Sequence, residues 1–502
     1  MIFLSIRKFT LKVLKLSMSI SYSSPFLLCL KICYNSHCSV SYGYSNESRE
    51  NDSMQLQSVR KLNAINSTNY RKYAKYILVA AFLIRFIIAL THAFWLYEYD
   101  GGLCHLIPLQ YYDFGQYGYI KSLAVNKAFP EMVTAASPAL GCVSQTYQPP
   151  VFYILSALVK ILVDSLGFSE LIALECIQLM NMMISFCSFC VCFKMLEEFD
   201  FSFVSKLNIL ILCAFSPIFL LIGLPICNDC LMTFFCLLAI LYTLRWRKNP
   251  TWKNTMLIMV FLVLGMLTKT SAVLIAPAIG AVFLHRFIKN KNERLMLLRK
   301  FVVFAVTSIP LGLSWLIRNK VKYDMSFSFV PRPWDPLPED ISALSRLGLP
   351  SIRQLTNPVV DFFAYREHSN IWGQMFHTFT FPQSIDFKVP SRILAISLLW
   401  TGIILYLLLL YLFVRYLISK APLIDRIFLG TIHFFILFMA LVFAFKYPYI
   451  CSVNFRYIVV IYVVMMFGAF QYVDKNPKYL KIVTTLACLF CLQSFILYIL
   501  PG

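Results

Sequence analysis

Asp113 and Tyr117 are the first residues of this 502-residue chain whose types and spacing suggest chemistry. They are four positions apart in the aromatic run 111–119, so they would share one face of a short helix. A carboxylate among aromatic side chains beside a membrane loses part of its hydration, which raises its pKa and suits a general base. The alternative is an interfacial helix with an aromatic belt and one solvated Asp.

Three basic residues, Lys269, Arg318 and Arg456, stand at the ends of apolar runs. A charge within a membrane segment is a functional candidate by default, although a Lys near the surface can also extend its ammonium group to water. Arg suits phosphate because its planar guanidinium donates two parallel hydrogen bonds. Three cations at one depth would therefore suit the phosphate of a lipid.

Other polar residues at the ends of apolar runs have simple structural explanations. Gln148 precedes two prolines, which fit the first turn of a helix. Asn228 and Asp229 begin a later run, where N-capping of a helix is the ordinary role. Cys227 and Cys230 have CxxC spacing, but no second pair supports a metal site, so packing is favoured.

These residues depend on a strongly apolar chain to position them. Hydrophobic residues make up 59% of it and charged residues 14%, compared with about 25% in soluble domains. Disordered chains, disulfide scaffolds and ordinary soluble enzymes are excluded. Apolar runs near the length of a membrane span occur at 74–96, 147–165, 170–193, 203–223, 226–244, 254–268, 270–287, 301–317, 391–414, 427–445, 456–473 and 482–500.

The net charge of +21 indicates orientation. Five stretches (1–75, 245–253, 286–300, 415–426 and 474–481) hold 27 of the 45 Lys and Arg but only 6 of the 24 Asp and Glu, a surplus equal to the whole net charge. Basic residues concentrated in short loops are predicted to be cytoplasmic. All the candidate residues above then fall on the opposite, outer side.

The sequence predicts an all-α polytopic protein of about eleven transmembrane helices. The two runs in 147–193 would break the alternation of sides unless one is re-entrant or tilted. Residues 1–73 are expected to be a cytoplasmic or poorly ordered extension, and 74–502 a transmembrane domain with outer loops 97–146 and 318–390. If 9–33 were instead a cleaved signal peptide, the topology would invert.

Six short elements, in order between residues 74 and 475, resemble the GT-C glycosyltransferases that use polyprenyl-phosphate sugars. The branch they resemble contains the protein O-mannosyltransferases and aminoarabinose transferases. The elements are Asp113 with Tyr117, Gln148-Pro149-Pro150, Asp229, Thr268-Lys269, the segment from Trp315 to Arg318 and Asn319, and Arg456-Tyr457. Two departures are Gln148, where the family has His, and a 318–390 loop too short for the large lumenal sugar-binding module.

The resemblance implies a GT-C-like fold with lumenal interfacial helices in the first outer loop. It implies inverting transfer of a sugar, typically mannose, from a dolichyl-type phosphate to a hydroxyl on a protein, glycan or lipid. Asp113 would be the general base, and the cations would stabilise the departing phosphate. The other five positions, Tyr117, Gln148, Asp229, Asn319 and Tyr457, would bind substrate. No metal, cofactor or nucleic acid is expected, and the location would be the endoplasmic reticulum or a bacterial inner membrane.

A transporter and a catalytically inactive scaffold are the alternatives. A transporter places charges near mid-bilayer and often contains an internal repeat. Here no repeat is evident, and the polar residues gather on one face, which favours an interfacial enzyme. Two further expectations concern the outer loops: Trp372 packs or stacks on a sugar, and Cys104 and Cys142 could form a disulfide.

Overall fold

The computed structural model describes residues 51–92, 115–131, 145–327, 341–358, 369–381 and 391–499, with side chains from Tyr70 onward. Within these ranges every regular element is a helix, as predicted. The α-helices are α3 (Asn51–Thr91), α4 (Gly115–Asn126), α5 (Val151–Ser165), α6 (Glu170–Met195), α7 (Phe203–Phe215), α8 (Pro217–Leu221), α9 (Asp229–Lys248), α10 (Trp252–Met266), α11 (Ala276–Lys289), α12 (Arg294–Tyr323), α13 (Ala343–Leu347), α14 (Ile352–Thr356), α16 (Ile371–Thr380), α17 (Arg392–Leu417), α18 (Leu423–Lys446), α19 (Val459–Lys475) and α20 (Leu480–Ile499).

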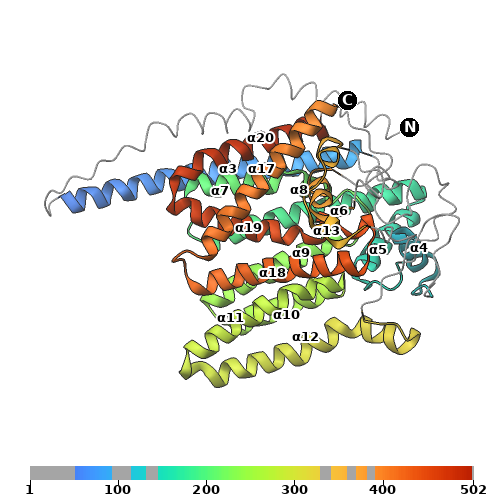
Figure 1. The fold of residues 1–502 in the computed structure, drawn as a ribbon. Helices are drawn as coiled ribbons and strands as arrows, with labels where there is room; N and C mark the ends of the chain where they lie inside the picture. Colours follow the sequence, from blue (N-terminus) through green and yellow to red (C-terminus); the bar gives the residue numbers. More distant parts are fainter. Residues whose placement is uncertain are drawn as a thin grey trace.

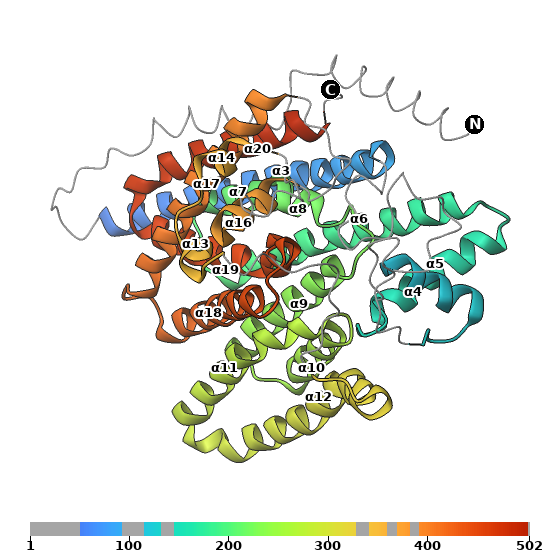
Figure 2. The ribbon, with the colours of Figure 1, turned by 45° about the vertical axis from the view of Figure 1, so that its right-hand side comes forward.

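Nine helices in the described ranges are long and apolar enough to cross a membrane. Two shorter apolar helices, α7 and α10, run beside them (Figures 1 and 2), and the predicted number of about eleven is reached when these two are counted as crossings. Of the two runs in 147–193, only α6 is among the nine. The 15-residue α5 is about 22 Å long, carries the Lys160–Asp164 ion pair, and packs on α4 at the end of the bundle where α12 finishes (Figure 2). The protein is therefore a multi-pass membrane protein whose alternation of sides is preserved.

Described residues of the stretches 245–253, 286–300 and 415–426, all predicted to be cytoplasmic, lie together at one end of the bundle, called here the basic end. Glu198, after α6, pairs with Arg245 and Lys248 at the end of α9. Arg247 pairs with Asp425 at the start of α18. These contacts place basic stretches from distant parts of the sequence side by side, as the charge pattern predicted. The opposite end is called the outer end.

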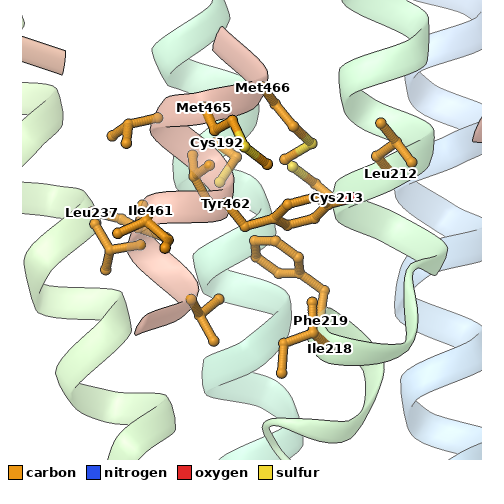
Figure 3. Packing of buried hydrophobic residues seen from close by; sticks show 14 of the residues in the cluster. Cys192, Leu212, Cys213, Ile218, Phe219, Leu237, Ile461, Tyr462, Met465 and Met466 are labelled. Atoms are coloured by element: carbon orange, nitrogen blue, oxygen red, sulfur yellow. The ribbon is translucent and has the colours of Figure 1, made fainter. Parts of the chain in front are cut away.

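Helix α19 forms the centre of the bundle and is buried along almost its entire length. Its Tyr462, Met465 and Met466 pack against side chains of α6, α7 and α8 (Figure 3). Two flexible Met side chains fill an irregular space between these helices. The residues that begin α19 at the outer end are therefore fixed against a packed core.

The predicted outer loop 318–390 contains more helix than its composition suggests. Helix α12 continues to Tyr323 and ends at Asp324, which has a left-handed φ of 50° and pairs with Lys320 at 2.5 Å. Polar side chains are compatible with helix once the chain leaves the apolar layer, so the helix outlasts the apolar run. Helix α16 is almost wholly buried against α8 and α17.

Candidate functional site

Asp229 is the first residue of α9 and is completely buried at the outer end. Its carboxylate contacts two cations from other parts of the chain. The Nζ of Lys269 is 2.5 Å from Oδ1, and the Nε of Arg456 is 3.4 Å from Oδ2. One carboxylate thus pairs with two cations, so the three side chains together carry a net charge of +1.

Tyr457 completes this group, which we call the Asp229 cluster (Asp229, Lys269, Arg456 and Tyr457). The ammonium nitrogen of Lys269 lies 4.3 Å from the centre of the Tyr457 ring, and Arg456 donates a 2.9 Å hydrogen bond to the Tyr457 hydroxyl. A cation over an aromatic face gains electrostatic attraction from the ring quadrupole. The ring therefore holds the charged head of Lys269 close to Arg456 despite their like charges.

Two breaks in the helical segments deliver Lys269 and Arg456 to Asp229. Helix α10 ends at Met266, and Lys269 has extended backbone angles before the 3₁₀ helix η6 (Thr270–Ile275) begins. Arg456 lies in a second 3₁₀ helix, η9 (Phe455–Ile458), where the side chain of Asn454 accepts a bond from its backbone N–H. Thr378 of α16 accepts a bond from the backbone N–H of Phe455 and anchors the same turn.

Asn228 does not cap α9, which corrects the N-capping interpretation. Its φ and ψ are helical, and its side chain makes no capping bond. The amide instead donates to the side-chain oxygen of Gln148 at 2.8 Å and to the backbone carbonyl of Thr268 at 3.1 Å. Asn228 therefore ties the start of α5 to the break that carries Lys269.

Arg318 and Asn319 lie in the last turns of α12 and extend the same network. Asn319 donates to the backbone carbonyl of Tyr147 at 2.9 Å and accepts a bond from Arg318. The guanidinium of Arg318 stacks 4.2 Å from the Trp315 ring centre. Since Tyr147 adjoins Gln148, a continuous chain of contacts connects Arg318 to the Asp229 cluster.

Tyr117 bonds to Glu170, a residue that the sequence analysis did not single out. Its hydroxyl donates to Glu170, the first residue of α6, at 2.5 Å. Burial, and then this hydrogen bond, raise the pKa of Tyr117 above its ordinary value. Helix α4 begins at Gly115, and Asp113 lies outside the described residues, as do Cys104 and Cys142.

Among the three ion-paired residues of the Asp229 cluster, Lys269 is the one that a ligand could reach most easily. Its side chain is 18% exposed, compared with 4% for Arg456 and 1% for Asp229. In the described ranges no three His, Cys, Asp or Glu side chains gather as metal ligands do. Trp372 donates its indole N–H to the carbonyl of Leu347 and packs on the core, which is the packing role considered for it.

Sequence reasoning missed several supporting residues. Glu170 and Thr378 had no distinguishing signal, because a charged helix start and a buried Thr are common. The sequence of α6 did contain a signal of a buried polar face: Gln178, Asn181 and Ser185 interrupt its apolar run at helical spacing.

Comparisons with known proteins give a distant structural likeness. A solved structure similar to this chain is that of ArnT from Cupriavidus metallidurans bound to undecaprenyl phosphate, at 12% sequence identity and a TM-score of 0.34, with 82% of this chain and 78% of that chain covered. No protein-family model matches the sequence, and no curated protein matches it.

Proposed function

We propose that the chain is a membrane glycosyltransferase that takes a sugar from a polyprenyl-phosphate donor and transfers it to an acceptor hydroxyl at the outer end. The observation that carries the proposal is the Asp229 cluster, in which two cations share one carboxylate. The excess positive charge lies at the ends of membrane-spanning segments, where the phosphate of a lipid would arrive. Lys269, the most exposed member of the ion-paired group, is the contact for that phosphate.

The reaction forms one bond and breaks one. The acceptor oxygen attacks the anomeric carbon from the face opposite the phosphate, so the configuration inverts. The bond between that carbon and the phosphate oxygen breaks, and its electron pair stays on the phosphate. Asp113 accepts the proton of the hydroxyl. Lys269, Arg456 and Arg318 stabilise the anion as it develops, which is most effective where water is excluded.

A phosphate leaves readily, so the proposed reaction requires no strong general acid. It also needs no cofactor besides the lipid-linked donor. Tyr117, Gln148, Asn319 and Tyr457 are proposed to bind substrate or to hold the groups that do. The finer proposal is a mannosyl donor on dolichyl phosphate and a location in the endoplasmic reticulum membrane, with a bacterial inner membrane as the alternative.

The test is to incubate membranes containing the protein with labelled polyprenyl-phosphate sugars and to fractionate the products. Lys269→Met should lower transfer by about 100-fold, the loss typical of one group that stabilises a developing anion. Lys289→Met is the matched control, because Lys289 is exposed at the other end of the same span. It should transfer at the unmodified rate.

Asp113→Asn separates an enzyme from a scaffold. Loss of transfer at normal expression supports Asp113 as the base, whereas full transfer would contradict that role. No transfer from any donor by the unmodified protein would contradict the enzyme proposal itself. Uptake of labelled donor into vesicles without transfer would indicate a transporter instead.

A further inference from the structure

The backbone that leads to Asp229 is irregular and buried. Helix α7 ends at Phe215, α8 has five residues, and no regular helix follows until α9 begins. Pro217 and Pro225 remove two N–H groups from this segment. Carbonyl groups that lack a helical partner inside a membrane protein must be satisfied by other protein groups.

One face of α6 supplies the missing donors. Gln178, Asn181 and Ser185 are buried at positions i, i+3 and i+7, which align along one side of a helix. Gln178 donates to the carbonyl of Leu224 at 3.2 Å, and Ser185 donates to that of Phe219 at 2.8 Å. We call these three residues the polar face of α6.

Asn181 contacts the chain on both sides of Asp229. Its amide donates to the carbonyls of Pro225 at 2.8 Å and Cys227 at 3.3 Å. Its own backbone carbonyl accepts a bond from the thiol of Cys230 at 3.4 Å. Residues 227 and 230 flank Asn228 and Asp229, so Asn181 fixes the turn from which both side chains project.

Arg85 of α3 extends these contacts to the end of α7. Its guanidinium is fully buried and donates to the hydroxyl of Ser185 and to the carbonyls of Phe219, Ala214, Cys213 and Ala81. Figure 3 shows Cys213 and Phe219 on the two sides of the α7–α8 break. The break is therefore held by side-chain donors along its length.

The spacing between this segment and α6 is tight. A Cβ atom added at Gly223 would lie 3.0 Å from the Asn181 carbonyl oxygen, from the Met182 sulfur and from the Ser185 Cβ. Since two of these three atoms are not at the end of a flexible side chain, a side chain there would push the segment away from α6. The hydrogen bonds from α6 and the close contact at Gly223 thus fix the same position of this segment against α6.

We infer that the polar face of α6 positions Asp229 and, through it, Lys269 and Arg456. The catalytic consequence rests on the proposed function, but the positioning itself does not. These residues are buried behind the Asp229 cluster and act on it as positioning residues. They set where the carboxylate stands between its two cations.

The first test uses Asn181→Leu in the purified full-length protein, with Asn208→Leu as the matched control. Asn208 is also a buried Asn in a membrane helix, but it bonds Val204 and Thr484. Acylation of Lys269 by an amine-reactive reagent is followed by peptide mass spectrometry, with Lys289 as internal reference. Lys269 should react about tenfold faster in Asn181→Leu, as expected when a buried hydrogen bond that holds its partner is lost. Asn208→Leu should leave the rate unchanged.

The second pair is Gly223→Ala with Gly280→Ala as control, since a Cβ at Gly280 meets nothing within 4 Å. Gly223→Ala keeps every polar group and changes only the spacing, so it tests the inference even if Asn181→Leu fails to fold. It should also speed acylation of Lys269. In transfer assays both site variants should lower kcat and leave the KM of the acceptor unchanged.

The outcomes separate the two proposals. Equal Lys269 reactivity in Gly223→Ala, Gly280→Ala and the unmodified protein would overturn the positioning role. Faster acylation in the two site variants, with no sugar transfer by the unmodified protein, would support the positioning role and reject the proposed function.

Discussion

Lys269 and Asp229 form a 2.5 Å ion pair between two interruptions of the helical bundle. Asp229 follows the irregular segment after α8, and Lys269 stands in the gap between α10 and η6. Lys269 lies between two helices and Asp229 is the first residue of α9, so each side chain projects from backbone that its neighbours hold in place.

Asp229 and Arg456 should be energetically coupled. Asp229→Asn leaves two cations together in a buried place and should cost about 3 kcal/mol of unfolding free energy. Arg456→Gln removes one of those cations, so the double variant should be less destabilised than the sum of the single variants, by about 1–3 kcal/mol. Denaturation in detergent measures the cycle. The exposed pair Lys320–Asp324 is the control, with about 0–1 kcal/mol expected, and an equal coupling at both pairs would contradict the prediction.

Tyr457 should act through its ring as well as through its hydroxyl. Tyr457→Phe keeps the face under Lys269 and loses the hydroxyl, so transfer should fall by about tenfold, the low end of the loss for one hydrogen bond to a charged group. Tyr457→Leu also removes the cation–π contact and should fall about tenfold further. Tyr472 lies at the basic end of α19, where Arg415 stacks 5.8 Å from its ring, and the same two changes there should not affect transfer. Equal losses of transfer in Tyr457→Phe and Tyr457→Leu would contradict a role for the aromatic ring.

Replacing Asn228 with Ser, another good helix-capping residue, should lower the rate of transfer. Ser is as good an N-cap as Asn, so Asn228→Ser would be neutral if capping were its role. Because the amide instead spans from Gln148 to Thr268, Ser is too short to replace it, and transfer should fall about tenfold for the two lost bonds. Transfer kinetics measure the loss, and circular dichroism verifies that helix content is retained. A fully active Ser variant would restore the capping interpretation.

The contact of Glu131 with α12 should persist to low pH. Hydrogen bonds from Lys322 and then Tyr323 hold the pKa of the Glu131 carboxyl below its ordinary value. A group with a lowered pKa in the folded state stabilises that state fully above its ordinary pKa and loses the effect as the pH falls through the lowered value. Hydrogen exchange at residues 127–131, compared with Glu131→Gln, should differ at pH 6 to 7 and converge only in acid. Convergence near neutral pH would contradict this.

Hydropathy predicted the existence of the spans better than their ends. The predicted run 301–317 is helix from Arg294 to Tyr323, because backbone hydrogen bonding continues after the apolar side chains stop. Charged residues at both ends, such as Lys300 and Lys322, belong to the helix although they lie outside the apolar run. The charge pattern correctly grouped the described stretches 245–253, 286–300 and 415–426 at one end, since the distribution of basic residues depends on the side of the membrane where a loop lies and not on how the helices pack.

The candidate site was predictable as a set of residue types and sides, but its pairings were not. Topology alone puts Asp229 and Lys269 at the same end, because α9 and α10 are consecutive and antiparallel. The sequence contains nothing that says α19 packs beside them and brings Arg456 within 3.4 Å of the same carboxylate. Asn228 illustrates the limit: its position matched a cap, and only the neighbouring chains show that its amide is used elsewhere.

The burial of Arg85 has a consequence for how the protein is made. An arginine at the centre of a span opposes insertion by about 2.5–3.5 kcal/mol, and here the compensating acceptors are neutral groups on α6, α7 and α8. Ser185 and Ala214 follow Arg85 by 100 and 129 residues, so the ribosome has not yet produced them when α3 enters the bilayer. The apolar residues of α3 must keep the segment in the membrane during that interval. Helix α3 therefore reaches its final position only after α7 has been synthesised, and the order of synthesis becomes part of the folding pathway.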